Sequence, residues 1–152
     1  MKITHIDEKG INLICSFEGF SEKPYICPAG VPTIGFGTTR YPSGNKVTMN
    51  DQSITKEFAI QLLQHDVKAF ELSVDALCVD SLTQNQFNAL VSFCYNLGAG
   101  ALKQSTLLKK VNANTMDKTI KDEFLKWCYA GKTRLAGLER RRKAEANLYF
   151  TL

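Results

Sequence analysis

The stretch SFEGFSEKPYICPAGVPTIGFGTT, residues 16–39, contains the clearest structural signals in the N-terminal part of the chain. The apolar side chains before it repeat at helical spacing, and their stripe runs up to Glu18, so a helix is expected to end at Gly19. Residues 25–39 instead predict strands, with a tight turn at 27–30, where Pro and Gly occur together, and side chains that alternate between two faces over 33–37. This pattern predicts a helix followed by a small, bent sheet.

The rest of the sequence has helical patterns only. Thr55 is a predicted N-cap, and the apolar stripe after it predicts a helix of about 20 residues, which spans roughly 30 Å. Residues 83–97 predict a second strong helix, closed by Gly98. Shorter helices are expected over 105–111, 117–127 and 137–150. This order of elements predicts an α+β protein with its strands near the N-terminus.

Length and composition predict one compact domain. The chain has 152 residues, of which 44% are hydrophobic and 22% are charged, as in ordinary soluble globular proteins. The chain has five cysteines, which is an odd number, and no two of them are closely spaced in the sequence. We therefore expect free thiols in a reducing cytoplasm. The N-terminal residues MKITHIDEKG contain no apolar signal-peptide core, and no run reaches the ~18 apolar residues of a membrane span.

Charge is distributed unevenly along the chain. The net charge is +4, and residues 101–152 carry twelve Lys or Arg against five Asp or Glu, whereas residues 1–100 carry seven against ten. A basic C-terminal part indicates attraction to a polyanion, such as nucleic acid, a membrane surface or an anionic cell wall. A solvated surface that only keeps the protein soluble explains the same pattern.

Glu18 is the first candidate for chemistry. A carboxyl group at the end of an apolar helix face is poorly hydrated and lies beside the negative end of the helix dipole, so both effects disfavour its charged form. An acid that keeps its proton near neutral pH can donate it to a leaving oxygen, as glycoside hydrolysis requires. The alternative is a structural role, in which Glu18 pairs with an arginine.

Cys27 and Thr33 flank the predicted turn, so a hairpin would bring them together beside Glu18. A threonine hydroxyl can hold a water molecule by hydrogen bonding, and a neighbouring group can take the proton of that water. A thiol, with an ordinary pKa of about 8.5, is mostly neutral at pH 7 unless a nearby cation lowers the pKa. The alternative for Cys27 is an inert, partly buried thiol at the end of a strand.

Four segments of the chain together resemble the phage-type lysozymes of glycoside hydrolase family 24, the endolysins that cut cell-wall peptidoglycan. In chain order they are SFEGF, YICPAGVPTIGFGTT, LTQNQFNALVSFCYNLGAGALKQSTLLKKVN and KWCYAGKTRLAGLERRRKAEANLYF. The family's signature, a Glu followed by an Asp nine residues later and a Thr fifteen residues after the Glu, falls here on Glu18, Cys27 and Thr33. The resemblance therefore covers nearly the whole chain and is specific in its spacing.

The resemblance implies a fold, an activity and a set of roles. The fold is a single lysozyme-like domain over 1–152, with an N-terminal lobe over about 1–55, a connecting helix over about 56–77 and a helical lobe over about 78–152. The activity is that of a muramidase, which hydrolyses the β-1,4 bond between N-acetylmuramic acid and N-acetylglucosamine without a cofactor or metal. Glu18 resembles the family's general acid, while the family's Asp and Thr orient an attacking water, with inversion at the anomeric carbon.

Cys27 is the departure from the family, because it stands where the family has an aspartate. Two catalytic roles are open to it: a weak base that activates the water held by Thr33, or a sulfur nucleophile that attacks the sugar directly. Direct attack followed by hydrolysis would retain the configuration, so the stereochemistry of the product separates these routes. We favour the water route because Thr33 is present. The alternative functions are a wall-binding relative that has lost its activity and a lytic transglycosylase.

The helical part of the chain is expected to contact the substrate. Ser105 is a candidate substrate-binding residue that either faces the glycan groove or only N-caps its helix. Arg142 shares a helix stripe with Glu145 and either pairs with it or approaches Glu18. Trp127 is a candidate for stacking on sugar, although a lone tryptophan in a helix is more often part of the core.

Three further hypotheses belong to other classes. A Cys–His peptidase would pair Cys27 with His5 or His65. A zinc amidase would need about three protein ligands, which two histidines and scattered cysteines do not supply. A nucleic-acid-binding module would use the basic part of the chain, although no recognition motif is present.

The resemblance also implies a partner and a location. The expected partner is bacterial peptidoglycan, with no specific nucleic acid and no membrane insertion, and the enzyme is expected to be a monomer. It is expected to accumulate in the host cytoplasm until a separate pore-former opens the inner membrane at lysis. It would then act on the cell wall from the periplasm.

Overall fold

The structure, a computed structural model, describes residues 1–152 and divides into two compact units. We call Ile14–Lys68 the hairpin unit, and Met1–Leu13 together with Ala69–Leu152 the helical unit. The lobe limits predicted at residues 55 and 77 differ from these, notably because the first 13 residues group with the later helices. Hydrogen bonds explain this grouping: the Asn88 amide donates to Asp7 Oδ1 at 2.7 Å, and the Ile6 N–H donates to Glu71 Oε2 at 2.7 Å.

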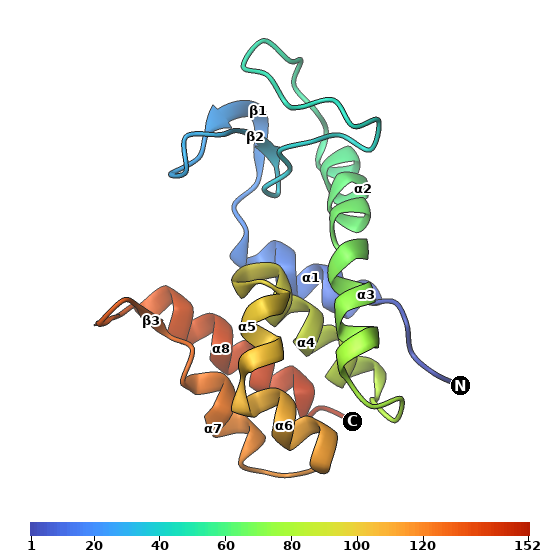
Figure 1. Cartoon of the computed structure of the whole chain (residues 1–152). Helices are drawn as coiled ribbons and strands as arrows, with labels where there is room; N and C mark the ends of the chain where they lie inside the picture. The colour runs from blue at the N-terminus through green and yellow to red at the C-terminus, as the bar shows by residue number, and fades with distance from the viewer. The chain divides into compact units, whose positions relative to one another are not determined.

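The hairpin unit contains a two-stranded sheet and a helix. β1 (Ser21–Ile26) and β2 (Pro32–Gly35) pair antiparallel, and long loops lead from them to α2 (Lys56–Asp66), as Figure 1 shows. The core of the unit is formed by buried Ile34, Val47 and Leu62, with Tyr41 and Ile54 packed against them. The sheet therefore rests on α2 through its β2 strand.

Gly35 permits this close packing of sheet on helix. Its φ angle is +67°, in the region that favours glycine, and a Cβ placed there would lie 3.1 Å from the Cβ of Ala59 on α2. Thr55 caps α2 as predicted, because its side chain accepts a hydrogen bond from the Phe58 N–H at 3.1 Å. The glycine-rich strand and the cap together fix where β2 meets the helix.

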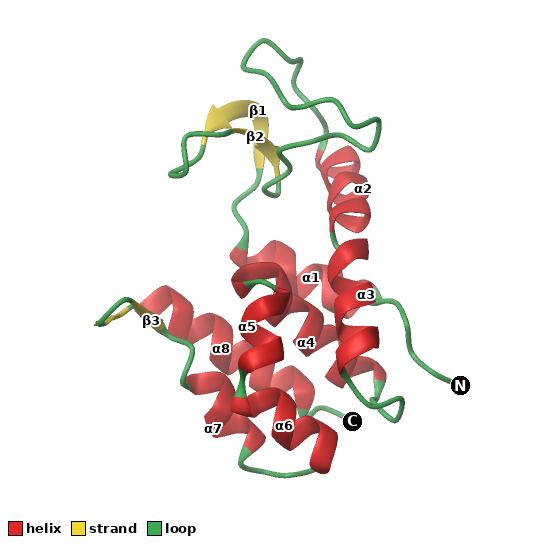
Figure 2. Ribbon diagram, viewed as in Figure 1, coloured by secondary structure: helices red, strands yellow, loops and turns green.

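The helical unit is built around α4 (Gln84–Leu97), in which every residue from Asn85 to Cys94 is buried. A helix that is buried all round forms the centre of a helical domain. α4 begins with a capping box between Thr83 and Gln86, and Gly98, with φ +91°, follows its end as predicted. The other helices of the unit are α5 (Ala99–Gln104), α6 (Thr106–Ala113), α7 (Ile120–Leu125) and α8 (Ala136–Tyr149), which Figure 2 shows in red.

Two helices, α1 (Glu8–Phe17) and α3 (Lys68–Leu77), include residues of both units. α1 crosses the boundary at Ile14, and α3 begins at the boundary near residue 68. The long helix predicted over 56–77 is helical at every position except Val67, which divides it into α2 and α3. Val67 keeps right-handed helical dihedral angles and its N–H donates to Leu63, so the interruption is local.

The expectation that only helices follow the N-terminal sheet is wrong. β3 (Tyr129–Ala130) and β4 (Thr133–Arg134) form a second small antiparallel hairpin late in the chain. Its two-residue turn begins with Gly131 at φ +62°, as two-residue hairpin turns require a positive φ. The helix predicted over 117–127 is confined to α7, and α5 was not predicted. None of the helices combines the length and the apolar character that a membrane span requires.

Candidate active site

Glu18 follows the last residue of α1 in the hairpin unit. Its N–H donates to the Ile14 carbonyl at 2.9 Å, so its backbone continues the last helical turn, and Ile14 is fully buried. The Glu18 side chain is half-buried. The prediction that Glu18 ends an apolar helix face is confirmed, whereas its role as a general acid stays a prediction.

The β1–β2 hairpin brings Cys27 and Thr33 together on one face of the sheet. Tyr25 lies opposite Thr33, and the Cys27 N–H donates to the Val31 carbonyl at 3.0 Å, so the pairing continues past the end of β1. Side chains two residues apart on a strand share a face, so Cys27 lies on the face of Tyr25 and therefore of Thr33. The predicted proximity of Cys27 and Thr33 is confirmed.

The turn between the strands has the predicted residues. The Gly30 N–H donates to the Cys27 carbonyl at 2.8 Å, which closes a four-residue turn through Pro28 and Ala29. Gly30 has a φ of +80°, a conformation that glycine adopts without steric cost. The turn holds Cys27 at a fixed position on the hairpin, because its N–H and its carbonyl are both bonded.

The hairpin stabilises the ionised form of the Cys27 thiol. The backbone amide of Val31, then the hydroxyl of Thr33, lower the pKa of Cys27 by hydrogen bonding, and this outweighs the opposing effect of desolvation. Thr33 is 3% exposed, and its hydroxyl oxygen also lies 2.9 Å from the Val31 carbonyl. A hydroxyl has one hydrogen, so it donates either to that carbonyl or to the sulfur. Ionisation of the thiol therefore favours the second arrangement.

Ser105 has the capping role that the sequence left as an alternative. It is 3% exposed, and its hydroxyl accepts a hydrogen bond from the Leu108 N–H at 3.0 Å and donates to the Leu102 carbonyl at 2.7 Å. Both bonds lie within the helical unit and join α5 to α6. They account for Ser105 as an N-cap, and the substrate-binding role stays a prediction.

Arg142 pairs with Glu145, the first of the two alternatives that the sequence left open for it. Both side chains are fully buried, with Arg142 Nε 2.8 Å from Glu145 Oε1. Arg142 Nη2 also donates to Asn96 Oδ1 at 2.6 Å, and its guanidinium lies 5.2 Å from the centroid of the Phe93 ring. Trp127 packs edge-on against the same ring at 5.6 Å, which supports its role in the core.

Arg141 is a member of this network that the sequence analysis missed. Its Nε lies 3.3 Å from Glu145 Oε2, and the Ser92 hydroxyl donates to the same oxygen at 2.6 Å. The i,i+4 spacing of Arg141 and Glu145 on one helix was an available signal. The partnership with Ser92 was not, because it joins positions 53 residues apart.

The remaining candidate groups lie on the surface or form no cluster. His5 is exposed and lies 3.5 Å from Glu71, and His65 is exposed and lies 3.9 Å from Asp66. No group of three or more His, Cys, Asp or Glu side chains is arranged to hold a metal ion. All five cysteines are free thiols.

Comparison with known proteins identifies the family. Residues 15–145 match the phage lysozyme family. The endolysin of Bacillus phage B103 is 44% identical over 147 residues, which are 97% of this chain and 54% of that protein, so the chain spans about half the length of that relative. The endolysin of Acyrthosiphon pisum secondary endosymbiont phage 1 is 39% identical over 149 residues, 95% of this chain and 97% of that protein.

A solved structure supports the family assignment that these sequence comparisons give. The crystal structure of a mutant of P22 lysozyme superposes with a TM-score of 0.88 at 34% identity and covers 98% of this chain and all of that one. The small antiparallel strand pair and the helical unit thus form a lysozyme-like α+β fold. The chain therefore belongs to the phage lysozyme family.

Proposed function

We propose that the protein is a muramidase that hydrolyses the β-1,4 bond between N-acetylmuramic acid and N-acetylglucosamine in peptidoglycan. Glu18 is the general acid, and Cys27 and Thr33 together orient and activate the attacking water. The observation that carries the proposal is the pairing of a thiol and a hydroxyl on one face of the hairpin, at the spacing from Glu18 that the family's signature has. Endolysins among the relatives support a wall substrate.

The proposed reaction balances in one displacement. The Thr33 hydroxyl holds a water molecule, the oxygen of that water bonds to the anomeric carbon, and its proton passes to the Cys27 sulfur. Glu18 gives its proton to the oxygen that leaves from the opposite face, so the configuration is inverted. The lowered pKa of Cys27 supports this role, because a cysteine accepts the proton of the water only as its thiolate.

One specific observation favours a second candidate function. The family's aspartate is replaced by a cysteine, and a relative that binds walls without cutting them would tolerate this loss. The two functions differ in one measurement, the turbidity of bacterial cells whose outer membrane has been removed. Clearing of the suspension supports the hydrolase, and binding without clearing supports the second candidate.

Variants at Cys27 test the proposed role of the thiol. Cys27→Asp restores the family's carboxylate and is expected to keep or raise the rate of clearing. Cys27→Ala is expected to lower it by at least about tenfold, as removal of a general base does. Cys15→Ser, which alters the other half-buried thiol of the hairpin unit, is the matched control and is expected to stay within about twofold of the parent.

The products distinguish the reaction from its alternatives. Mass spectrometry of digested muropeptides is expected to show reducing muramic acid ends, and nuclear magnetic resonance of the fresh product is expected to show inversion. Anhydro sugars would identify a lytic transglycosylase, and retained configuration would identify direct attack by sulfur. Full activity of Cys27→Ala would exclude any chemical role for the thiol.

The release and location of the enzyme are part of the same proposal. The helical unit carries the chain's entire excess of positive charge, which supports attraction to the polyanionic wall with its acidic stem peptides. We expect the enzyme to wait in the host cytoplasm for a separate pore-former and then to act from the periplasm as a monomer. Lysis by the enzyme expressed without any pore-former would contradict this.

A further inference from the structure

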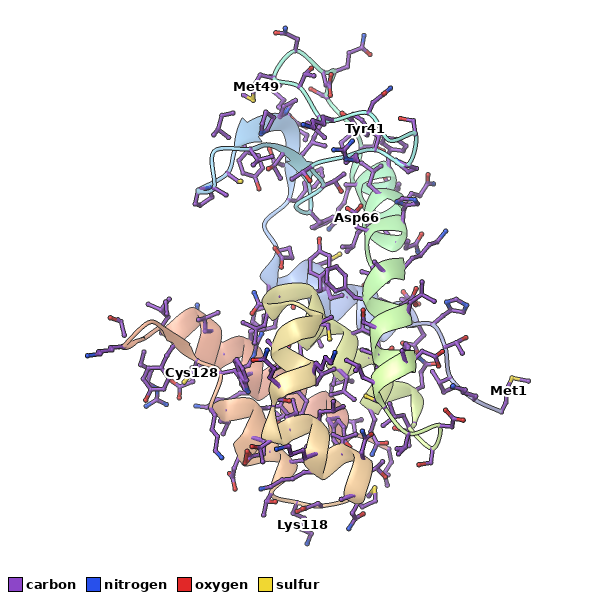
Figure 3. All side chains as sticks on the ribbon, viewed as in Figure 1. Met1, Tyr41, Met49, Asp66, Lys118 and Cys128 are labelled. Atoms are coloured by element: carbon purple, nitrogen blue, oxygen red, sulfur yellow. The ribbon has the colours of Figure 1, made fainter.

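A pocket of the hairpin unit lies outside the Cys27 hairpin. It has a volume of about 660 Å³ and is lined only by residues between Tyr41 and Phe58, which form the loop before α2 and the first turn of that helix. This volume lies within the range of small-molecule sites. Figure 3 labels Tyr41 on this loop, and Met49 farther along it.

The walls of the pocket are held in place by the core of the unit. The loop carries Val47, which is 3% exposed and belongs to the same cluster as Ile34 on β2. Tyr41 packs against that cluster from the pocket side, and its N–H donates to the Asn45 carbonyl at 2.9 Å. The Ile54 N–H donates to the Glu22 carbonyl of β1 at 2.9 Å. The pocket is therefore preformed, which reduces the entropic cost of binding a ligand.

Asp51 supplies a fixed acceptor in this pocket. Its carboxylate accepts hydrogen bonds from the Tyr41 hydroxyl at 2.6 Å, from the Thr48 hydroxyl at 2.6 Å and from the Thr48 N–H at 3.0 Å. The Thr48 hydroxyl, then that of Tyr41, lower the pKa of Asp51, so the group is charged at neutral pH. Burial, then the bond to Asp51, raise the pKa of Tyr41 to about 12, so the phenol stays a donor.

The other lining groups combine an aromatic surface with amides. Phe58 is 42% exposed although it is a large apolar residue, and it lies at the start of α2 beside the loop. Asn50 and Gln52 are exposed and offer both donors and acceptors. A pyranose ring has a C–H face that packs on an aromatic ring and an edge of hydroxyl groups that carboxylates and amides bind.

The charge and donor set of the pocket argue against other small ligands. Asp51 is the one charged lining group, so an anionic ligand would be repelled. Three of the four lone-pair sites of its carboxylate are already used by protein donors. A calcium ion needs six to eight oxygen ligands and is not matched by what remains.

We propose that the Tyr41–Phe58 pocket is a second carbohydrate site that binds an uncharged N-acetylated hexosamine unit. Phe58 packs on the face of the sugar ring, while Asp51 and the amides of Asn50 and Gln52 bind its hydroxyl and acetamido groups. That the natural ligand is the glycan strand of the wall rests on the proposed function, whereas the site itself does not. Such a site would retain the enzyme on a strand between cleavage events.

Nuclear magnetic resonance titration of the full chain tests the site. The probe is triacetylchitotriose, and the backbone amides of residues 50–58 are expected to shift and to saturate at millimolar concentrations. Gln52→Ala and Phe58→Ala are each expected to weaken the affinity by about fivefold or more, the loss of one polar or stacking contact. Gln61→Ala, an exposed amide on α2, and Met49→Ala, an exposed apolar residue of the loop, are the matched controls and should change it by less than about twofold.

The outcomes separate this site from the proposed catalysis. Saturable shifts at residues 50–58 support the site even where the protein clears no bacterial suspension, a result that would refute only the hydrolase. Shifts confined to residues 25–33, with normal clearing, would overturn the second site and leave the hydrolase in place. Shifts at residues 50–58 caused by calcium chloride and not by the sugar would also overturn it.

Discussion

The two units of the molecule differ in net charge and in how deeply they bury their charged and reactive side chains. The hairpin unit has five Lys or Arg and five Asp or Glu, whereas the helical unit has fourteen and ten and therefore carries all of the chain's +4. Both cysteines of the hairpin unit are half-buried, and all three of the helical unit are buried. The helical unit buries Glu145 with two arginines, while the hairpin unit keeps Cys27 beside a single hydroxyl.

Charged and reactive side chains therefore have different consequences in the two units. A buried carboxylate between two guanidinium groups is fixed by them and contributes to the fold, because its removal leaves buried positive charge. A thiol on a short hairpin contributes little to packing and is available for chemistry. We therefore expect substitution of Glu18, Cys27 or Thr33 in the hairpin unit to change activity, and substitution of Glu145 or Ser105 in the helical unit to change stability.

The largest expected effect is that of Glu18→Gln. An amide cannot donate the proton that the leaving oxygen needs, so the rate of wall lysis is expected to fall by about 10²- to 10⁴-fold. The thermal unfolding midpoint should change little, because the substitution keeps the shape of the side chain. Turbidity clearing and a thermal scan of the same sample measure both, and a stable, fully active variant would refute the role of Glu18 as acid.

Glu145→Gln is expected to lower stability, in contrast to Glu18→Gln, which is expected to lower activity. It leaves Arg141 and Arg142 buried without their counter-charge, which costs about 3–5 kcal/mol of the free energy of unfolding. Urea denaturation measures this loss. The control is Glu139→Gln on the same helix, whose partners Arg134 and Lys143 are exposed, and which should cost less than about 1 kcal/mol. Equal losses for the two variants would show that burial of the arginine partners does not increase the cost of removing the carboxylate.

Ser105→Ala is expected to have a smaller effect on stability. The substitution removes the N-cap of α6 and leaves the Leu108 N–H without its partner, for a loss of about 1 kcal/mol. Ser105→Thr keeps an acceptor for that N–H and should recover part of the loss. If Ser105→Ala instead lowers wall lysis without changing the urea midpoint, Ser105 has the substrate role predicted from the sequence.

The smallest expected effect concerns pH. The pKa of Cys27 is lowered in the folded protein, so the folded state favours the thiolate. Ionisation of Cys27 therefore adds to the free energy of unfolding as the pH rises. This added stability, and the thiolate itself, are lost as the pH falls through the lowered pKa. Alkylation by iodoacetamide should therefore reach Cys27 first, since burial raises the pKa of Cys15 and raises those of Cys78 and Cys94 to about 12. Mass spectrometry of the labelled peptides checks this order.

Thr33→Val sharpens the pH prediction. The substitution keeps the shape of the side chain but removes the hydroxyl that stabilises the thiolate, so the pH midpoint for alkylation of Cys27 should move upward. The rate of lysis should fall as well, because no group then holds the water. An unchanged midpoint would show that the Val31 amide alone lowers the pKa.

Much of the fold could be predicted from the sequence because its signals are local. The cap at Thr55, the stop at Gly98 and the turn at 27–30 are each set by residues a few positions apart. The β3–β4 hairpin was missed although Gly131 marks its turn, since its strands are only two residues long and have no alternating pattern. The break at Val67 was missed because a β-branched residue carries no stop signal in a helix.

The candidate site was predictable only in part, for the same reason. The spacing from Glu18 to Cys27 and Thr33 lies within one stretch, so the sequence indicated which side chains the hairpin would bring together. The pocket between Tyr41 and Phe58 was not predicted, because its groups are ordinary loop residues until the loop folds back on Ile34. Proximity created by packing leaves no pattern in the chain.

Residue types at short, fixed spacings were enough to indicate the N-terminal helix and hairpin, the main helices that follow, the turn at 27–30 and the family. The folded structure was needed to show that Ser105 caps a helix, that Glu145 has two guanidinium partners, and that hydrogen bonds from Val31 and Thr33 favour the Cys27 thiolate. The physical reason is that burial, and with it the strength of every polar contact, depends on which distant segments exclude water from a group.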